Sequence, residues 1–281
     1  MFRKILIANR GEIAVRIIRA ARELGIETVA VYSTADKEAL HTLLADEAVC
    51  IGPAKSTESY LNMNAVLSAA VLTGSEAIHP GFGFLSENSK FATMCEEVGI
   101  KFIGPSGSVM DMMGDKINAR AQMIKAGVPV IPGSDGEVHT AEEALEVADR
   151  IGYPVMLKAS AGGGGKGIRK VERAEDLVPA FESASTEAKA AFGNGAMYLE
   201  RVIYPARHIE VQILADQFGH VVHLGERDCS LQRNNQKVLE ESPSVAIGKT
   251  IRDQIGSAAV RAAESVGYEN AGTIEFLYDE G

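Results

Sequence analysis

The fold is decided first by residues 4–26, KILIANRGEIAVRIIRAARELGI. KILIA is a short apolar run typical of a buried strand, and the apolar residues from Ile13 to Leu24 recur at helical spacing behind it. Gly25 is a typical residue just past a helix end. A buried strand followed at once by an amphipathic helix is the start of a βαβ unit.

The rest of the first hundred residues repeats this alternation. Further strands are predicted at 28–33, 75–80 and 100–104, and helices at 65–74 and 86–99, the second opened by Ser86 as its N-cap. Strands separated by helices of this length predict a parallel, doubly wound sheet.

The pattern changes after Asp115. A helix at 116–127 leads to a Pro- and Gly-rich linker at 128–136. The remaining predicted helices cover 141–152, 174–190 and 250–266, and the predicted strands cover 153–160, 167–171, 196–203, 207–215, 219–226 and 273–278. This second half is therefore expected to be α+β with antiparallel hairpins.

The amino-acid composition and the net charge exclude several classes of protein. The 281 residues are 46% hydrophobic and 23% charged, as in ordinary globular proteins, and the net charge of −10 argues against a nucleic-acid binder. Cys50, Cys95 and Cys229 lack metal-ligand or paired spacing, which is typical of reduced thiols. The N-terminus lacks a signal-peptide core and no apolar run approaches a membrane span, so we expect a cytoplasmic protein without a membrane partner.

The glycine-rich segment ASAGGGGKG, residues 159–167, is the most distinctive local feature. A dinucleotide-binding turn would be followed by a helix, but IRKV is expected to be a strand, and Gly167 stands where a Walker loop needs Ser or Thr. The residues leave two alternatives. The segment is either a glycine hairpin that folds its amides over phosphates or a flexible turn that contacts no ligand.

Several charged residues also have two interpretations. Lys158 ends a strand just before the glycines, and Lys116 lies in the first turn of a helix, where a bound anion would compensate its unfavourable position. Either could be an ordinary surface lysine. Strand alternation puts Glu275 on the face opposite Ile274, as an exposed edge residue or as a metal ligand. His208 is compatible with a structural role.

Taken in order, these segments resemble the biotin carboxylases of the ATP-grasp superfamily. The resemblance covers the whole chain and is carried by KILIANRGEIAVRIIRAARELGI, EAIHPGFGFLSEN, FIGPS with MGDK, LKASAGGGGKG, ERDCS with QK, and GTIEFLY. It implies a Rossmann-like pre-ATP-grasp domain at 1–113 and an ATP-grasp domain at 114–281. A mobile glycine-rich lid subdomain would cover about 131–203, with residues 162–167 poorly ordered in the absence of nucleotide.

The resemblance also implies an activity. Biotin carboxylases use ATP, Mg²⁺ or Mn²⁺ and bicarbonate to form carboxyphosphate, and then carboxylate biotin on a biotin carboxyl carrier protein. This is the first half-reaction of acetyl-CoA carboxylase in fatty acid biosynthesis, or of a related carboxylase. The implied partners are the carrier protein, carboxyltransferase subunits and a second copy in a homodimer, with no nucleic acid.

Site residues follow from the same resemblance, position by position. Lys237 matches a catalytic lysine on the bicarbonate side, Glu275 a metal-binding glutamate and Phe82 a residue near the biotin ring. The positions that match ATP contacts are Lys116, Lys158, Gly164, Gly165, Glu200, Arg201, Val202, Ile203, His208, Gln232, Asn235 and Leu277.

This sequence departs from the family pattern in three respects. Asn235 stands where a histidine or another larger residue is common, and Phe82 stands where some members have tyrosine. The family pattern continues past Gly281 with a second metal glutamate and a catalytic arginine. From this we expect a fragment, truncated at its C-terminus, that binds nucleotide weakly and does not carboxylate biotin by itself.

Other functions remain as alternatives. A second ATP-grasp ligase, similar to carbamoyl-phosphate synthetase, is disfavoured by ANRGEIA and HPGFGFLSEN. An inactive nucleotide-binding fragment is the non-enzymatic alternative. A dehydrogenase is disfavoured because the turn after KILIA contains only Gly11, without the glycines that approach a pyrophosphate.

Overall fold

The computed structural model describes residues 1–114, 116–160, 167–233 and 236–279. The chain divides into two compact units. The first contains residues 1–112 with the short segments 215–220 and 267–271, and the second contains the remainder.

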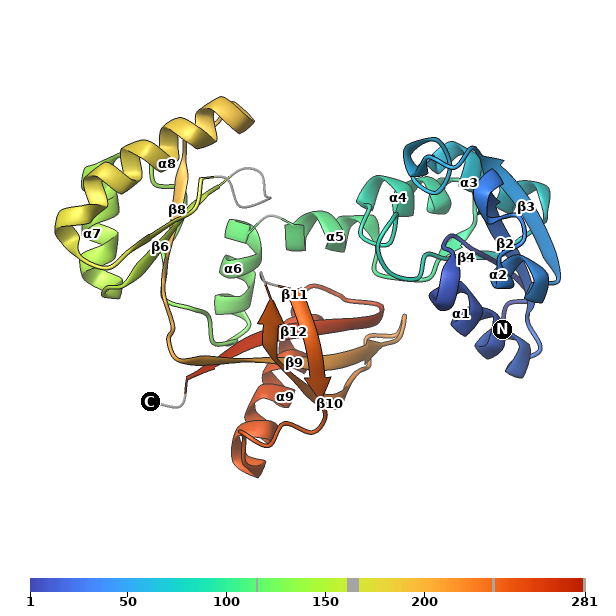
Figure 1. Ribbon diagram of the computed structural model, residues 1–281. Helices are drawn as coiled ribbons and strands as arrows, with labels where there is room; N and C mark the ends of the chain where they lie inside the picture. The colour runs from blue at the N-terminus through green and yellow to red at the C-terminus, as the bar shows by residue number, and fades with distance from the viewer. Residues whose placement is uncertain (115, 161–166, 234–235, 280–281) are drawn as a thin grey trace. The chain divides into compact units, whose positions relative to one another are not determined.

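The first unit is built on a five-stranded sheet in the order β3-β2-β1-β4-β5 (Figure 1). Its strands are β1 (Lys4–Ile7), β2 (Glu27–Ser33), β3 (Glu47–Gly52), β4 (Ala77–His79) and β5 (Lys101–Phe102). Each pair of neighbours is parallel, so the predicted parallel sheet is confirmed. The alternation of buried strands and helices along the sequence is the physical origin of this arrangement.

Helices cover both faces of this sheet. Ile5 and Ile7 pack with α1 (Gly11–Glu23) on one face, where α2 (Leu40–Leu44) also lies. Leu6 and Ala8 pack with α3 (Met63–Leu72) and α4 (Ser89–Glu97) on the other face. Side chains of one strand thus alternate between two apolar cores, as the period of a β-strand requires.

Two expectations for this unit were wrong in detail, and one strand was not predicted. Leu24 lies just beyond α1 and is exposed, because the helix ends at Glu23. Asn88, not Ser86, caps α4, with its side-chain oxygen accepting from the Phe91 N–H. The strand β3 was missed because its sequence, EAVCIG, starts with a charge and shows no clear apolar alternation.

The second unit contains a three-stranded antiparallel sheet in the order β7-β6-β8, in the segment predicted to be the lid. Its strands are β6 (Val155–Ala159), β7 (Arg169–Val171) and β8 (Met197–Arg201), and its helices are α7 (Ala141–Ile151) and α8 (Leu177–Phe192). Leu157 and Leu199 pack with Phe181 of α8 in a shared apolar core.

A second sheet in this unit has the order β11-β10-β9-β12. Its strands are β9 (Ala206–Ala215), β10 (Val221–Arg233), β11 (Gln236–Glu241) and β12 (Asn270–Asp279). Helix α9 (Lys249–Ser265) covers one face, where Ala258 and Ala262 pack with Ile274 and Phe276. The antiparallel β10-β11 pair agrees with the predicted α+β class.

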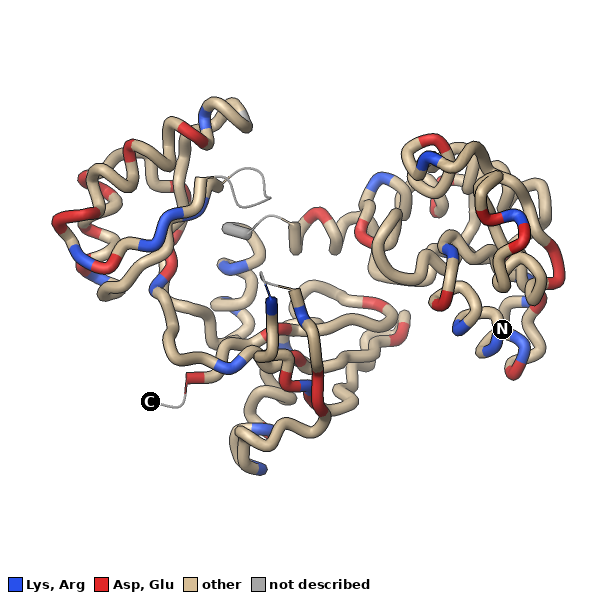
Figure 2. The backbone as a smooth tube through the Cα atoms, in the orientation of Figure 1, with Lys and Arg blue, Asp and Glu red and all other residues tan. Residues whose placement is uncertain are grey.

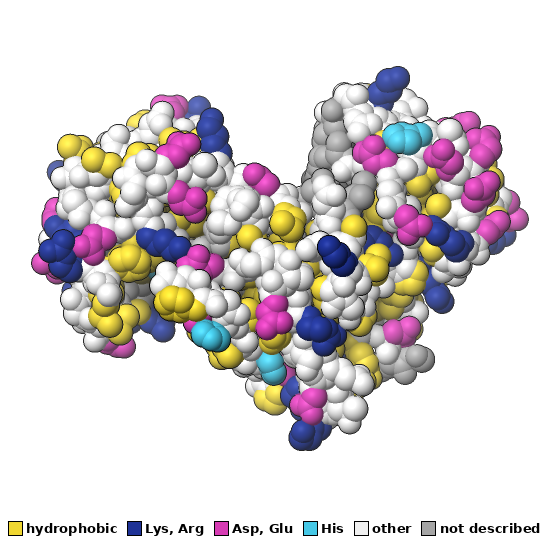
Figure 3. All heavy atoms as spheres, turned by 180° about the vertical axis from the view of Figure 1, so that it is seen from behind, with side chains coloured by type: hydrophobic (Ala, Val, Ile, Leu, Met, Phe, Trp, Pro, Cys, Tyr) yellow, Lys and Arg dark blue, Asp and Glu magenta, His cyan; other side chains and the backbone are white. Residues whose placement is uncertain are grey.

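The remaining helices are short. They are α5 (Gly107–Gly114), α6 (Lys116–Lys125) and the 3₁₀ turns Thr34–Asp36, Ser56–Glu58 and Ala174–Asp176. Across the parts of the chain that the structure describes, each helix is too short or too polar to cross a membrane. Basic and acidic residues are distributed over both units, and the face drawn in space-filling form shows the two signs intermixed (Figures 2 and 3).

The first testable consequence concerns the N-terminal core. Phe91 is fully buried and meets Phe102 edge to face, with the ring centroids 6.1 Å apart. We predict that Phe91→Ala lowers the free energy of unfolding by about 3–5 kcal/mol, because it leaves a cavity in a packed core. The control Phe218→Ala, at an exposed position, is expected to change it by about 0.5 kcal/mol or less. Urea unfolding of both variants would contradict this if they lost equal stability.

Candidate functional site

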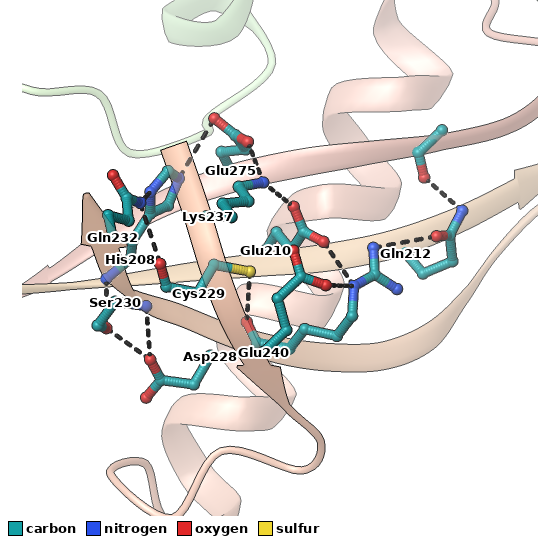
Figure 4. A network of polar contacts seen from close by, with 12 residues as sticks. His208, Glu210, Gln212, Asp228, Cys229, Ser230, Gln232, Lys237, Glu240 and Glu275 are labelled. Carbon is teal, nitrogen blue, oxygen red and sulfur yellow. Dashed lines mark hydrogen bonds and ion pairs between the residues drawn. The ribbon is translucent and has the colours of Figure 1, made fainter. Parts of the chain in front are cut away.

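One face of the β11-β10-β9-β12 sheet carries a chain of polar side chains (Figure 4). In β9, the residues Ile209, Val211 and Ile213 are buried. His208, Glu210 and Gln212 alternate with them and therefore project from the opposite side of the strand. The sheet thus separates an apolar face from a polar one.

Glu210 is the centre of the polar face. It is only 4% exposed, yet its two carboxylate oxygens have different cationic partners. Oε1 accepts from Arg227 Nε at 2.5 Å, and Oε2 accepts from Lys237 Nζ. Burial by itself would raise the pKa of Glu210, but the bonds from Lys237 and Arg227 outweigh it and hold that pKa below its ordinary value. The carboxylate is therefore ionised at neutral pH.

Lys237 joins Glu210 to Glu275. Its Nζ donates to Glu275 Oε1 at 2.7 Å, from β11 to β12. Burial would lower the pKa of Lys237, whereas the hydrogen bonds to Glu210 and Glu275 raise it, and the net direction is upward. Lys237 is thus a permanent cation held between two carboxylates.

His208 contacts the other oxygen of Glu275. The amide nitrogen of Gln232 lies 2.6 Å from His208 Nδ1 and also donates to the Cys229 carbonyl, 3.0 Å away. An amide nitrogen can only donate, so Nδ1 accepts and the imidazole proton is on Nε2. This Nε2 faces Glu275 Oε2 at 3.2 Å. Glu275 therefore receives one donor at each oxygen.

An irregularity in the strand pairing brings Lys237 and Glu240 to the same side. Leu231 pairs with Leu239 and Gln232 with Lys237, so Val238 is an extra residue in β11. In a regular strand, residues three positions apart lie on opposite faces. The extra residue of a bulge turns the later of the two to the same face as the earlier one. Glu240 Oε2 accordingly lies 3.7 Å from Arg227 Nε.

Cys229 lies beside these carboxylates. The ligand atoms of Glu210, Cys229 and Glu240 are within 4.8 Å of one another, which is compatible with a metal ion. However, both oxygens of Glu210 already accept from cations, which supply the positive charge. Burial raises the pKa of the Cys229 thiol to about 12, so it is protonated. These residues are better described as an ion-paired cluster than as a metal site.

Glu275 fits a hard cation better. Its side chain is 51% exposed, and carboxylate oxygens are the ligands that Mg²⁺ prefers. Its donors, Lys237 and His208, are side chains that can move when a cation binds. The strand places Ile274 and Phe276 against α9, so the predicted alternation around Glu275 is what the structure shows.

Two other predicted residues meet in the lid sheet. Lys158 Nζ forms an ion pair with Glu200 Oε2, from β6 to β8. Met156 is the direct partner of Glu200 in the ladder, so Lys158 is its diagonal neighbour on the same face. Beyond them, Arg201 N–H donates to the Pro132 carbonyl and Val202 N–H to the Pro154 carbonyl, each at 2.8 Å. These bonds fix the backbone that leads to Ile203.

The predicted residues thus form two described groups, one around Glu275 and one around Lys158. Leu277 lies two residues beyond Glu275 on β12, and Phe82 is exposed in the turn after β4 of the other unit. Gly164, Gly165 and Asn235 lie outside the described residues, as do residues 162–166 of the predicted disordered segment. Lys116 begins α6, but its side chain is also outside the description.

Sequence reasoning missed part of the site. It did not select Glu210, Gln212, Arg227 or Glu240. It also ended the predicted strand at 226, whereas β10 continues to Arg233 and buries both Glu226 and Asp228. The polar residues at alternate positions of HIEVQ, 208–212, were the available signal. The partners of that stripe are distant in sequence, so the pattern could not identify them.

Glu210 gives a second testable prediction. We expect Glu210→Gln to lower the free energy of unfolding at pH 7 by about 1.5–3 kcal/mol. The amide has one acceptor oxygen where the carboxylate has two, so one of the charge-assisted bonds is lost. The folded pKa of Glu210 is below the ordinary 4.5, so this stabilisation is fully present above about pH 4.5 and disappears as the pH falls through the folded pKa. Urea unfolding at several pH values measures this, with Glu58→Gln at an exposed ion pair as the control. A pH-independent difference would contradict it.

Comparison with known sequences finds two family matches in this chain. Residues 1–110 match the family "Biotin carboxylase, N-terminal domain", and residues 115–281 match "Carbamoyl-phosphate synthase L chain, ATP binding domain". Biotin carboxylase 1 of Bacillus subtilis is 59% identical over 279 residues, which cover 99% of this chain and 62% of that protein. The biotin carboxylase of Pseudomonas aeruginosa is 53% identical, over 100% of this chain and 63% of that protein.

Solved structures with a similar fold come from the same family of proteins. A biotin carboxylase–β,γ-ATP complex from Campylobacter jejuni matches with a TM-score of 0.91 and 53% identity, over 100% of this chain and 63% of the other. The biotin carboxylase domain of Hydrogenobacter thermophilus 2-oxoglutarate carboxylase, solved with MgADP and bicarbonate, matches with a TM-score of 0.88 and 52% identity, over 100% and 62%. The chain spans about three fifths of the length of these relatives. Its two matched domains, its sequence identity and its fold together establish that this chain belongs to the biotin carboxylase family.

Proposed function

We propose that the intact protein carboxylates biotin, with ATP and bicarbonate as co-substrates and carboxyphosphate as the intermediate. The observation that carries the proposal is the arrangement of Lys237, Glu275 and His208 on one face of the β9–β12 sheet. It combines a permanent cation for an anionic substrate with an oxygen ligand for a metal ion. The relatives with bound β,γ-ATP or with MgADP and bicarbonate add support.

Each group has a defined task in this proposal. Mg²⁺ or Mn²⁺, when bound, would offset the charge of the phosphates during phosphoryl transfer. Glu275 would hold that ion, which requires its oxygens to exchange Lys237 and His208 for the metal. Lys237 keeps its bond to Glu210 and retains an N–H for bicarbonate. His208 and Gln232 would then face the nucleotide from neighbouring strands.

The lid sheet would contribute the second cation. Lys158 is paired with Glu200 in the structure, and a triphosphate would compete for its ammonium. Glu200, Arg201, Val202 and Ile203 would lie along the base and ribose, with Leu277 at the adenine. Lys116, Gly164, Gly165 and Asn235 are proposed to contact the phosphates, and Phe82 to lie near the biotin ring.

The wider assignments follow from the family. We propose domains at 1–113 and 114–281 with a lid at about 131–203, a homodimer, a biotin carboxyl carrier protein as the biotin donor and carboxyltransferase subunits as further partners. Related chains include chloroplastic enzymes, so the cytoplasmic location is a prediction that rests on the sequence alone.

One observation favours a second candidate. The family matched by residues 115–281 is named for carbamoyl-phosphate synthase, another ligase that activates carboxylates. Residues 1–110 match a family named for biotin carboxylase and favour the first candidate. Free biotin should stimulate bicarbonate-dependent ADP formation by the intact protein. Stimulation by ammonia or glutamine instead of biotin would support the alternative and overturn the proposal.

The role of Lys158 gives a third prediction. Lys158→Gln should raise the KM for ATP or lower the turnover about tenfold or more, because a charge-assisted phosphate contact is worth about 1.5–3 kcal/mol. The fold should be retained. Lys170→Gln is the matched control, since Lys170 lies on the adjacent strand β7 and forms an ion pair with the exposed Glu172. Steady-state ATP kinetics with unchanged values for Lys158→Gln would remove Lys158 from the site.

A further inference from the structure

The N-terminal unit contains a tightly held turn at the point where its sheet reverses strand order. Strand β1 pairs with β2 on one side and with β4 on the other. The strands β2 and β3 therefore extend the sheet in one direction from the β1-β4 pair, and β5 extends it in the other. Ligands of open parallel sheets bind outside the carboxyl ends of the strands at such a point. Here Asn9 follows β1 and Pro80 follows β4, and the two residues are in contact.

Asn9 is buried at this position and bonded on each side of its amide. It is 3% exposed, and its amide nitrogen donates to the carbonyl oxygens of Pro80 and Phe82, each at 2.7 Å. Its side-chain oxygen accepts from the Arg10 N–H at 2.9 Å. Both N–H bonds of the amide are therefore used to hold the two ends of the Pro80–Phe82 segment.

The residue between these two carbonyls is shaped to the contact. Gly81 has φ of +65°, and a Cβ atom there would lie 2.9 Å from Asn9 Nδ2. Its N–H donates to His79 Nδ1 at 3.1 Å. Burial lowers the pKa of His79, which keeps the imidazole neutral and able to accept. A side chain at position 81 would force Asn9 away from the turn.

The far end of the turn is held independently. Phe84 has φ of +43°, unusual for a residue with a side chain, and its ring stacks on Tyr60 with the centroids 5.1 Å apart. The Tyr60 hydroxyl donates to Asp36 at 2.7 Å. Phe82 lies between these two anchors and is 61% exposed, so its ring is presented to solvent from a fixed backbone.

We propose that Asn9 is a positioning residue, which holds the turn so that Phe82 presents its ring to the bicyclic ring of biotin. The inference rests on the proposed function, because biotin is the ligand assigned to Phe82. Asn9 acts through the backbone of the turn and contacts no substrate itself. It should therefore affect the KM for biotin and leave the KM for ATP unchanged.

The test uses Asn9→Asp in the intact protein, because the two side chains have the same shape and only the donor group is lost. The carboxylate oxygen would face two carbonyl oxygens. We expect the KM for free biotin to rise about tenfold or more, as the loss of two hydrogen bonds implies. The KM for ATP should change less than about twofold, because a substitution has little effect on a distant site with which it shares no contacts. Asn88→Asp, which retains the cap of α4, is the matched control and should resemble the wild type.

A second measurement does not depend on activity. Chymotrypsin cleavage after Phe82 and Phe84 reports opening of the turn, and it should become about tenfold faster in Asn9→Asp but not in Asn88→Asp. Gly81→Ala, which displaces Asn9 without changing it, should reproduce both effects and covers the case that Asn9→Asp does not fold. Unchanged cleavage in a folded variant would overturn the inference.

The other combinations of results also test the inference on Asn9. Faster cleavage with an unchanged KM for biotin, in a protein whose wild type carboxylates biotin, would make Asn9 structural only and overturn the inference. If the wild type shows no biotin-dependent reaction, the proposed function fails and with it the substrate assignment. In that case the cleavage rates still establish or refute the part that Asn9 plays in holding the turn.

Discussion

The buried carboxylate of Glu210 is the constraint on which the polar face of the β9–β12 sheet depends. An ionised group that is withdrawn from water must be paired, and its partners must satisfy both oxygens. Arg227 takes one oxygen and Lys237 the other, so the loss of either cation would leave one buried oxygen without a partner. The bond to Glu210 thereby fixes the position of Lys237. Its bond to Glu275, whose side chain is 51% exposed, is the one that we propose a ligand exchanges.

The same constraint extends across four strands. Gln212 connects Arg227 to the backbone of Gly272 on β12, with its amide nitrogen donating at 2.8 Å. On the other side, Gln232 orients His208 toward Glu275. The bulge at Val238 is what allows Glu240 and Lys237 to share one face. Since each member is oriented by the next, a substitution in the interior of the network is expected to alter the exposed end as well.

Asn9 applies the same principle without charge. A buried amide with all its hydrogen-bonding groups satisfied specifies one backbone conformation, because any other leaves a donor unpaired. In the N-terminal unit it joins the loops that follow β1 and β4, where a dinucleotide-binding fold would leave room for a ligand. The bonds of Asn9 between these two loops are consistent with the absence of the pyrophosphate glycines after KILIA.

The sequence by itself determined the fold class, because the periods of apolar residues are local: KILIA and the helix after it predict β1 and α1, and TIEFLY predicts which side of β12 carries Glu275. It also determined the family through segments in a fixed order, and with it Lys158, Lys237 and Glu275 as candidates. Only the tertiary structure identified Glu210, Arg227 and Asn9 as the residues that hold these groups, and Asn88 as the true cap of α4. The cationic partners of Glu210 and the carbonyl partners of Asn9 lie 17 to 73 residues away along the chain. Local patterns carry no information about such pairs, since which side chains meet is decided by strand order, register and bulges.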